Sequence, residues 1–284
     1  MKKIGFIDYY ISEWHANNYP KWISEASERL GEDFKVSYAW AELDVSPVDG
    51  VTTDEWCEKF GVERCASIAE LCEKSDYICI LAPSNPEKHL SYAGEAFPFA
   101  KNTYVDKTFA PTYAEACEIF ALGKQYGTRF FSTSALRYAE ELCELSECQN
   151  LIVTGSGSNF DEYFIHMAEM AVKLLGTDLV SVSAHSQSEK QCTVMAEFLS
   201  GKRATMVFSP SLPYSACAEF KGGTTAYRKI ESKYFLALIE DILRFFTSGR
   251  EPFDQGETLT VMKLREEAIR SRTDGGVSVL AGKN

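Results

Sequence analysis

The sequence predicts an α/β fold in two parts, a doubly wound parallel sheet followed by an α+β domain with a mainly antiparallel, open sheet. Through the first half of the 284 residues, short apolar runs alternate with amphipathic stretches of helical length, which is the pattern of βαβ units. After about Ser134, runs of alternating apolar and polar residues take over, as expected for antiparallel strands with one buried face. We therefore predict one domain over residues 1–134 and a second over 135–284.

Five apolar runs of the first half are predicted to be strands: Ile4–Ile7, Phe34–Trp40, "YICILAP" (77–83), "NTYVDK" (102–107) and "RFFSTS" (129–134). The third is apolar along almost its whole length, as a strand buried on both faces should be. Four stretches are predicted to be helices: Pro20–Leu30, "SIAELCEKS" (67–75), "EKHLSYAGEAFPFA" (87–100) and "TYAEACEIFALGKQYG" (112–127). The first helix is expected to kink or restart at Pro20, with Asn17 or Asn18 as its cap.

Four alternating runs of the second half are predicted to be neighbouring antiparallel strands: "VSVSAHS" (180–186), "CTVMAEFL" (192–199), "ATMVFS" (204–209) and "SACAEFKG" (215–222). "GKR" (201–203) is expected to form one hairpin turn and "KGGTTAYRK" (221–229) a looser one. Three helices are predicted in this half: Asp161–Leu175, Lys233–Thr247 and Glu257–Arg272. The predicted strands have their apolar residues on one face, for example Val194 and Phe198. The pattern does not show whether the other face is covered.

The 29 Lys+Arg against 41 Asp+Glu give a formal net charge of −12. This balance argues against nucleic acid as a partner, since nucleic-acid binding normally needs a basic face, and a phosphate ligand would have to be held by local donors. No apolar run approaches the ~20 residues that span a bilayer, and Asp8 interrupts the run that a secretory signal would need. The nine cysteines form no C-x-x-C pair, so we expect reduced thiols, no metal site and a cytoplasmic location.

The turn after the first predicted strand lacks the usual phosphate loop. In doubly wound sheets, ligands bind beyond the carboxyl ends of the strands, and a G-x-G-x-x-G turn holds their phosphates. Here the turn reads "DYYISEWH" (8–15), without a glycine. The side chains of Tyr9 and Tyr10 would obstruct a pyrophosphate, and Asp8 and Glu13 add negative charge. Either carboxylate is also able to cap the following helix, which would fill the anion site with protein.

Three further segments carry candidate site residues: "APSNPEKH" (82–89) after one strand, "DKTFAP" (106–111) after the next, and the helical "DEYFIHMAEM" (161–170). Together with "SALRY" (134–138) and the two closing helices, in this order, they resemble the glucose–fructose oxidoreductase / inositol dehydrogenase / rhizopine-catabolism (Gfo/Idh/MocA) family over nearly the whole chain. The first has the family's Pro-x-x-x-x-x-His, the second stands in place of its Glu-Lys-Pro, and the helix has its acid-x-x-x-His-x-x-acid pattern.

The resemblance implies a Rossmann-type first domain and hydride transfer between a nicotinamide dinucleotide and a carbinol of a sugar, polyol or related small molecule. Carried over by position, Lys107 is the catalytic lysine, with Asp106 in place of the family's glutamate and Thr108 in place of its proline. His166 is the catalytic helix histidine. Glu162 lies four residues earlier on the same helical face, where it is able to orient the imidazole. A base and a cationic donor are what carbinol oxidation requires.

The remaining site residues also follow from the resemblance. It places the following residues at the cofactor: Asp8, Tyr9, Tyr10, Pro83, Ser84, Asn85, His89, Asp106 and Lys107. Glu42, just past the second strand, is the candidate for the acid that contacts the ribose and favours NAD over NADP, with Asp44 as the weaker candidate. Arg137 and Glu169 are assigned to the substrate. The resemblance also implies a homodimer or homotetramer formed through the second sheet.

Alternatives remain for several of these residues. His89 is more simply a residue that fixes a helix start, and Arg137 is equally suited to holding the two domains together. Two functions are compatible with the sequence: an enzyme that uses NAD(H) with a rebuilt first loop, or a non-catalytic ligand-binding or regulatory protein on the same scaffold. The presence of Lys107 and His166 favours the enzyme, whereas the missing glycines favour the ligand-binding protein.

Overall fold

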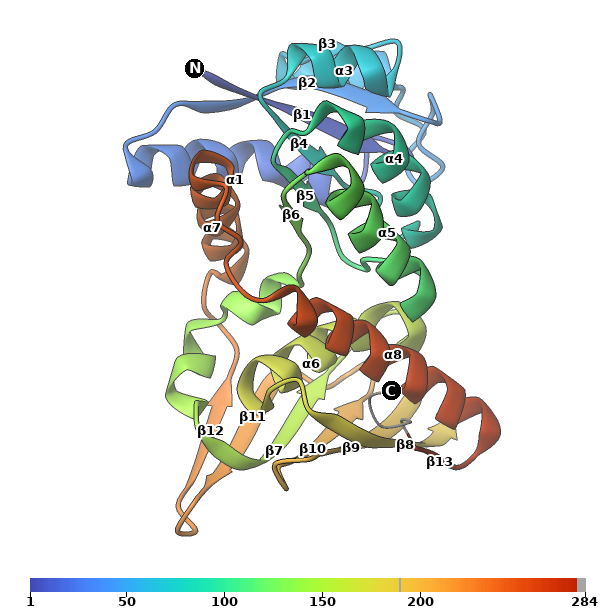
Figure 1. The fold of residues 1–284 in the computed structure, drawn as a ribbon, viewed down its shortest axis with the longest axis vertical. Coiled ribbons are helices and arrows are strands. Elements are labelled where there is room, and N and C mark those ends of the chain that lie inside the picture. The colour runs from blue at the N-terminus through green and yellow to red at the C-terminus, as the bar shows by residue number, and fades with distance from the viewer. Residues whose placement is uncertain (189, 280–284) are drawn as a thin grey trace. The chain divides into compact units, whose positions relative to one another are not determined.

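The computed structural model describes residues 1–188 and 190–279. The chain divides into two compact units: the first contains Met1–Thr133 and Phe235–Phe253, and the second contains Ser134–Tyr234 and the segment from Asp254 onward (Figure 1). The sequence predicts contiguous domains, whereas the structure groups helix α7 (Tyr234–Ser248) with the first unit. Aromatic packing within this unit explains the grouping, because Phe235 of α7 stacks on Trp22 with ring centroids 5.0 Å apart.

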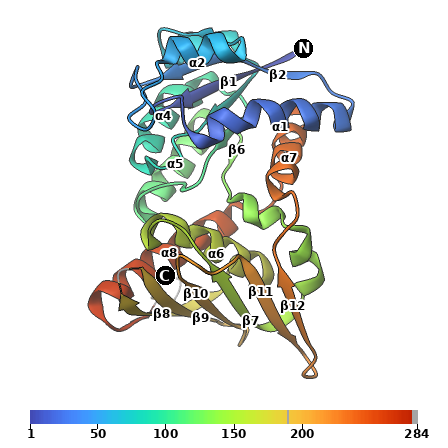
Figure 2. The same cartoon turned by 180° about the vertical axis from the view of Figure 1, so that it is seen from behind.

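The first unit is built on a six-stranded sheet in the order β3-β2-β1-β4-β5-β6, with parallel pairing throughout. Its strands are β1 (Lys2–Asp8), β2 (Phe34–Ala41), β3 (Glu63–Arg64), β4 (Tyr77–Ile80), β5 (Thr103–Val105) and β6 (Phe130–Phe131). This order is that of a doubly wound sheet, so the predicted fold class is confirmed. Helices α3 to α5 lie over one face in Figure 1, and α1 and α2 over the other face in Figure 2.

The helices of the first unit are α1 (Trp14–Leu30), α2 (Thr53–Phe60), α3 (Ile68–Lys74), α4 (His89–Ala96) and α5 (Tyr113–Tyr126), with 3-10 turns η1 (Pro86–Lys88) and η2 (Phe97–Phe99). The sequence prediction missed α2 and β3. A local signal for α2 exists, because Thr52 and Glu55 form a reciprocal capping box at its start.

Helix α1 begins six residues earlier than predicted, and Pro20 lies inside it. The predicted restart at Pro20 with an asparagine cap is therefore wrong. Glu13 caps the helix instead, and His15 and Tyr19 are buried on the sheet side of the first turns. This capping and burial outweigh the one backbone hydrogen bond that a proline cannot donate.

The second unit contains a seven-stranded sheet in the order β12-β11-β7-β10-β9-β8-β13. Its strands are β7 (Cys148–Gly155), β8 (Leu179–Ser188), β9 (Gln191–Phe198), β10 (Arg203–Phe208), β11 (Ser215–Phe220), β12 (Thr225–Lys229) and β13 (Val277–Val279). The predicted, mainly antiparallel sheet is confirmed, with β7 and β10 as a parallel pair. The prediction that β10 and β11 are neighbours is wrong, because β7, which the sequence analysis missed, lies between them.

One face of the second sheet is buried and the other is open. The helical elements of this unit are η3 (Ala135–Tyr138), η4 (Glu140–Leu145), α6 (Phe160–Leu175) and α8 (Gln255–Asp274). Val194 and Phe198 are buried, as the alternation predicts, whereas Ile152, Met195 and Tyr227 are 49%, 45% and 57% exposed. Among the described residues, no helix combines the length and the apolar character needed to cross a bilayer.

Candidate functional site

The first candidate site lies in the first unit, at the edge where the carboxyl ends of β1, β4 and β5 meet. Asp8 is the last residue of β1, and its side chain is buried. Its Oδ1 atom accepts hydrogen bonds from the backbone N–H groups of Tyr9 (2.7 Å) and Ala82 (3.1 Å). Its Oδ2 atom has no hydrogen-bond partner among the described residues. Burial, followed by the charge of Glu13, raises the pKa of Asp8 well above its usual range, so protonation is favoured.

Glu13 fills the position at which a nucleotide-binding helix would meet phosphate. Its carboxylate accepts hydrogen bonds from the backbone N–H of His15 at 2.7 Å and from that of Ala16, two donors in the first turn of α1 that have no acceptor within the helix. The side chain is only 8% exposed. Burial raises the pKa of Glu13, although the charge of His15 opposes this effect. The expectation that a carboxylate of this turn caps the helix is confirmed for Glu13.

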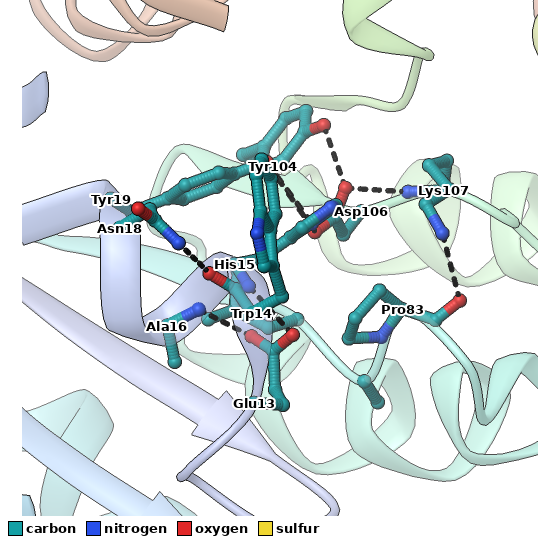
Figure 3. A network of polar contacts seen from close by, with 12 residues as sticks. Glu13, Trp14, His15, Ala16, Asn18, Tyr19, Pro83, Tyr104, Asp106 and Lys107 are labelled. Atoms are coloured by element: carbon teal, nitrogen blue, oxygen red, sulfur yellow. Dashed lines mark hydrogen bonds and ion pairs between the residues drawn. The ribbon is translucent and has the colours of Figure 1, made fainter.

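Asp106 forms the centre of a buried polar network (Figure 3). Its Oδ1 atom accepts hydrogen bonds from the Tyr104 hydroxyl at 3.1 Å and from the backbone N–H of Lys107 at 2.8 Å. Its Oδ2 atom contacts Nδ1 of His15, and the Tyr19 hydroxyl lies 3.5 Å away. Burial pushes the pKa of Asp106 upward, but the charge and hydrogen bond of His15 and the charge of Lys107 outweigh burial and lower it. Asp106 is therefore held as a carboxylate.

Lys107 follows Asp106 and is 8% exposed. Its Nζ atom donates a hydrogen bond to the carbonyl oxygen of Pro83 at 3.5 Å (Figure 3). The structure thus brings together two of the predicted segments, the one after β4 and the one after β5. Ser84 and Asn85 continue the first of these segments, and Asn85 Nδ2 donates to Glu87 at 2.9 Å.

Glu42 lies one residue past the end of β2, where a ribose-binding acid is expected. Its carboxylate accepts hydrogen bonds from Lys88 Nζ at 2.6 Å and from the Tyr92 hydroxyl at 2.7 Å. The hydrogen bond from Lys88 is the largest cause of its lowered pKa. The same ammonium lies 4.8 Å from the centre of the Tyr9 ring, and the ring of Tyr10 lies 6.0 Å from that of Tyr9.

His89 is the first residue of α4 and is fully buried. Its ring nitrogens contact two carbonyl oxygens, that of Phe109 at 3.0 Å and that of Leu81 at 2.6 Å. Burial lowers the pKa of His89, which favours the neutral ring. These contacts join the end of β4 to the segment after Lys107 and support the structural alternative for His89.

The second candidate site lies in the second unit, on helix α6. His166 Nδ1 lies 2.7 Å from Oγ of Ser134, a buried hydroxyl that the sequence analysis did not assign a role. The rings of Tyr163 and Tyr214 contact the imidazole edge-on, with centroids 5.8 and 5.9 Å away. Glu162 takes part in the cap of α6, since its backbone N–H donates to the Asn159 side chain at 2.8 Å.

Arg137 and Glu169, the predicted substrate residues, form a buried ion pair within the second unit. Arg137 Nη1 lies 3.0 Å from Glu169 Oε1, and its Nη2 contacts Glu257 of α8. Glu169 also accepts a hydrogen bond from the backbone N–H of Ser134 at 3.3 Å. The pair therefore joins η3, α6 and α8 and holds Ser134, the partner of His166.

His15, Tyr19, Tyr104 and Ser134 are the site residues that sequence reasoning missed. His15 had a local signal, because it lies two residues after Glu13 in a turn at the ligand-binding edge of the sheet. The partnership of His15 with Asp106 spans 91 positions in the sequence, and no local pattern shows it. No group of three or more His, Cys, Asp or Glu suited to hold a metal occurs in the described part of the chain.

Comparison with known proteins shows a likeness in structure. No protein-family model and no curated protein matches the chain. GenD2 from gentamicin A biosynthesis, solved in complex with NAD, matches with a TM-score of 0.79 and 13% identity over 99% of this chain and 97% of that one. Aldose-aldose oxidoreductase from Caulobacter crescentus matches with a TM-score of 0.74 and 16% identity over 98% of this chain and 100% of that one.

Scyllo-inositol dehydrogenase from Lactobacillus casei matches with a TM-score of 0.76 and 12% identity over 99% of this chain and 98% of its own. Two of these neighbours are named as an oxidoreductase and a dehydrogenase, the third was solved with NAD, and all three cover both units. The shared property is the fold. The architecture implied by the Gfo/Idh/MocA resemblance is thus confirmed at the level of structure.

The residues at the start of α1 do not fit a dinucleotide pyrophosphate. A phosphate bound there would need the amides of His15 and Ala16, and the Glu13 carboxylate already occupies both. The neighbouring Asp8 adds a second buried carboxyl group. Lys107 and the carbonyl oxygen of Pro83, by contrast, place a hydrogen-bond donor and an acceptor at the same edge of the sheet, which suits the hydroxyl groups of a ribose.

Proposed function

We propose that this chain is an oxidoreductase that acts on a CH–OH group of a sugar, polyol or related small molecule and uses a nicotinamide cofactor, NAD rather than NADP. The observation that carries the proposal is the buried Lys107 ammonium, which lies beside a buried carboxylate at the carboxyl edge of a doubly wound sheet. The structural neighbours that share this fold include an aldose-aldose oxidoreductase, a scyllo-inositol dehydrogenase and GenD2, which was solved in complex with NAD. Glu42, an acid just past β2, supports the choice of NAD.

The chain's own residues supply the acid–base chemistry in this proposal. Lys107 donates a hydrogen bond to the carbinol oxygen and stabilises the charge that develops on it. Asp106 remains ionised through its contact with His15, and its carboxylate accepts the backbone N–H of Lys107. In the second unit, His166 is the group proposed to take up or return a proton, and the hydroxyl of Ser134 fixes its ring orientation.

Glu162, Arg137 and Glu169 have supporting roles in this proposal. Glu162 stabilises the start of the helix that carries His166. Arg137 and Glu169 position Ser134, because they form a buried ion pair and Glu169 accepts a hydrogen bond from the Ser134 backbone. Their effect on substrate is then indirect, through the orientation of the imidazole.

We also propose that two or four copies associate through the open face of the second sheet. Tyr227 pairs in register with Cys217, Cys217 with Ile152, Ile152 with Thr205 and Thr205 with Met195, so these side chains form one row across the sheet. Three of the five are large apolar side chains that are about half exposed. A row in which exposed, large apolar side chains predominate is typical of a surface that is covered by a partner.

One observation favours the alternative function, a non-catalytic ligand-binding or regulatory protein. The Glu13 carboxylate occupies the helix terminus that would bind phosphate, so the chain lacks the usual binding site for the pyrophosphate of a dinucleotide. A regulatory protein on the same scaffold would not need to bind a dinucleotide pyrophosphate.

A titration separates the two functions. NADH fluorescence is recorded against wild-type protein at high concentration, and a panel of sugars and polyols is then tested for turnover with NAD and with NADP. Binding of NADH together with turnover of at least one polyol supports the enzyme. If neither nucleotide binds and no substrate in the panel turns over, the ligand-binding alternative replaces it.

A further inference from the structure

We infer that the Glu13 side chain is a built-in anion that excludes phosphate from the start of α1, so that this chain binds the nicotinamide–ribose end of its cofactor without help from the pyrophosphate. Glu13 is then a specificity-determining residue that selects against phosphate ligands at this edge of the sheet. The nature of the ligand rests on the proposed function, whereas the exclusion of phosphate rests on the geometry of Glu13 alone.

The first argument is the hydrogen bonding of the carboxylate. Oε2 accepts from the backbone N–H of His15 at 2.7 Å, and Oε1 accepts from that of Ala16. Helix α1 has 17 residues, so its N-terminus carries the full partial positive charge of a helix dipole. A carboxylate held by two amides at this position is the same interaction that an incoming phosphate oxygen would make.

The second argument is the unpartnered oxygen of Asp8. Oδ2 of this buried side chain makes no hydrogen bond within the described part of the chain. Burial and, after it, the charge of the neighbouring Glu13 raise the pKa of Asp8. A phosphate that approached the turn would meet two buried carboxyl groups in a region of low dielectric constant. Since burial favours the neutral form of Asp8, the repulsion of a phosphate in this turn depends on the Glu13 carboxylate.

The third argument concerns the ligand groups that suit this carboxyl edge of the first sheet. Near Asp8 and Glu13 lie the carboxylate of Asp106 and the imidazole of His15, and the backbone N–H of Lys107 donates to that carboxylate. This combination of hydrogen-bond donors and acceptors suits hydroxyl and amide groups, which carry no net charge. A ribose and a carboxamide meet that description, and a pyrophosphate does not.

The test compares two substitutions that both keep a helix cap. Glu13→Ser is neutral, short and favoured as an N-cap, whereas Glu13→Asp keeps both the cap and the negative charge. Isothermal titration with inorganic pyrophosphate and with ADP-ribose is carried out on the wild type and on both variants at low ionic strength. Circular dichroism confirms that each variant is folded, and Glu13→Asn replaces the serine variant if that one does not fold.

We expect Glu13→Ser to bind pyrophosphate and ADP-ribose at least about tenfold more tightly than the wild type, and Glu13→Asp to stay within about threefold of it. If the serine and asparagine variants show no gain, or if the wild type already binds pyrophosphate as tightly as the serine variant, the inference is overturned. Turnover by the wild type tests the proposed function separately. A gain in phosphate affinity without wild-type turnover leaves the inference standing and removes the enzyme.

Discussion

Replacing Asp106 by asparagine is expected to destabilise the first unit by about 3 kcal/mol. The carboxylate is buried and has two donors on Oδ1, the Tyr104 hydroxyl and the Lys107 backbone N–H, and two groups on Oδ2, His15 and Tyr19. Asparagine keeps an oxygen for the first pair. It removes the charge that His15 faces and places an amide N–H₂ group against the imidazole.

The magnitude follows from the kind of contact that is lost. A hydrogen bond to a charged group contributes about 1.5–3 kcal/mol, and removal of one partner of a buried ion pair costs about 3–5 kcal/mol. Because half of the hydrogen bonds to Asp106 survive, the lower part of the second range applies. For a domain of this size the melting temperature of the first unit should fall by roughly 6–12 °C.

The assay is a double-mutant cycle with Asp106→Asn and His15→Gln, followed by thermal and urea denaturation. We expect a coupling free energy of about 2 kcal/mol, since each substitution removes the same contact. The pKa of Asp106 is lowered in the folded chain, so its stabilisation is complete above the unfolded value of about 3.9 and is lost as the pH falls through the folded pKa. Additive effects of the two substitutions, with a coupling below about 0.5 kcal/mol, would refute the reasoning.

Three further predictions concern single groups. Lys107→Ala should lower turnover by at least about a thousandfold while the melting temperature and nucleotide affinity change little, and unchanged turnover would remove Lys107 from the mechanism. The Asp8→Asn variant should become more stable relative to the wild type as the pH rises above about 4, by up to about 1.4 kcal/mol per pH unit. The reason is that the raised pKa of Asp8 makes its ionisation costly in the folded chain. Denaturation at several pH values measures this effect, and parallel stability curves of the two proteins would contradict it. Ile152→Asp should dissociate the proposed oligomer, and light scattering measures the resulting mass. Leu199→Asp, at an exposed apolar residue on the hairpin turn, is the matched control. An unchanged mass of the Ile152→Asp variant would place the interface elsewhere.

Much of the architecture follows from local pattern. The near-continuous apolar run of β4 and the alternation along β9 and β10 report the burial of each strand, because a side chain's environment repeats with the period of its own element. The glycine-free turn at 8–15 was also readable from the sequence, together with the prediction that a carboxylate caps the helix. Helix caps involve neighbours three residues away, so they too are local properties.

Other features depend on which elements become neighbours in the folded chain. The sequence cannot show that β7 lies between β10 and β11, since sheet order is set by the packing of whole strands. It cannot show that α7 packs with the first unit, or that His15 contacts a carboxylate 91 positions away. The sequence alone therefore determined the two sheets and the charged turn, because these depend on residues close together in the chain. Only the tertiary structure decided which distant groups, such as Asp106, contact that turn, because burial and pairing over long separations depend on the fold as a whole.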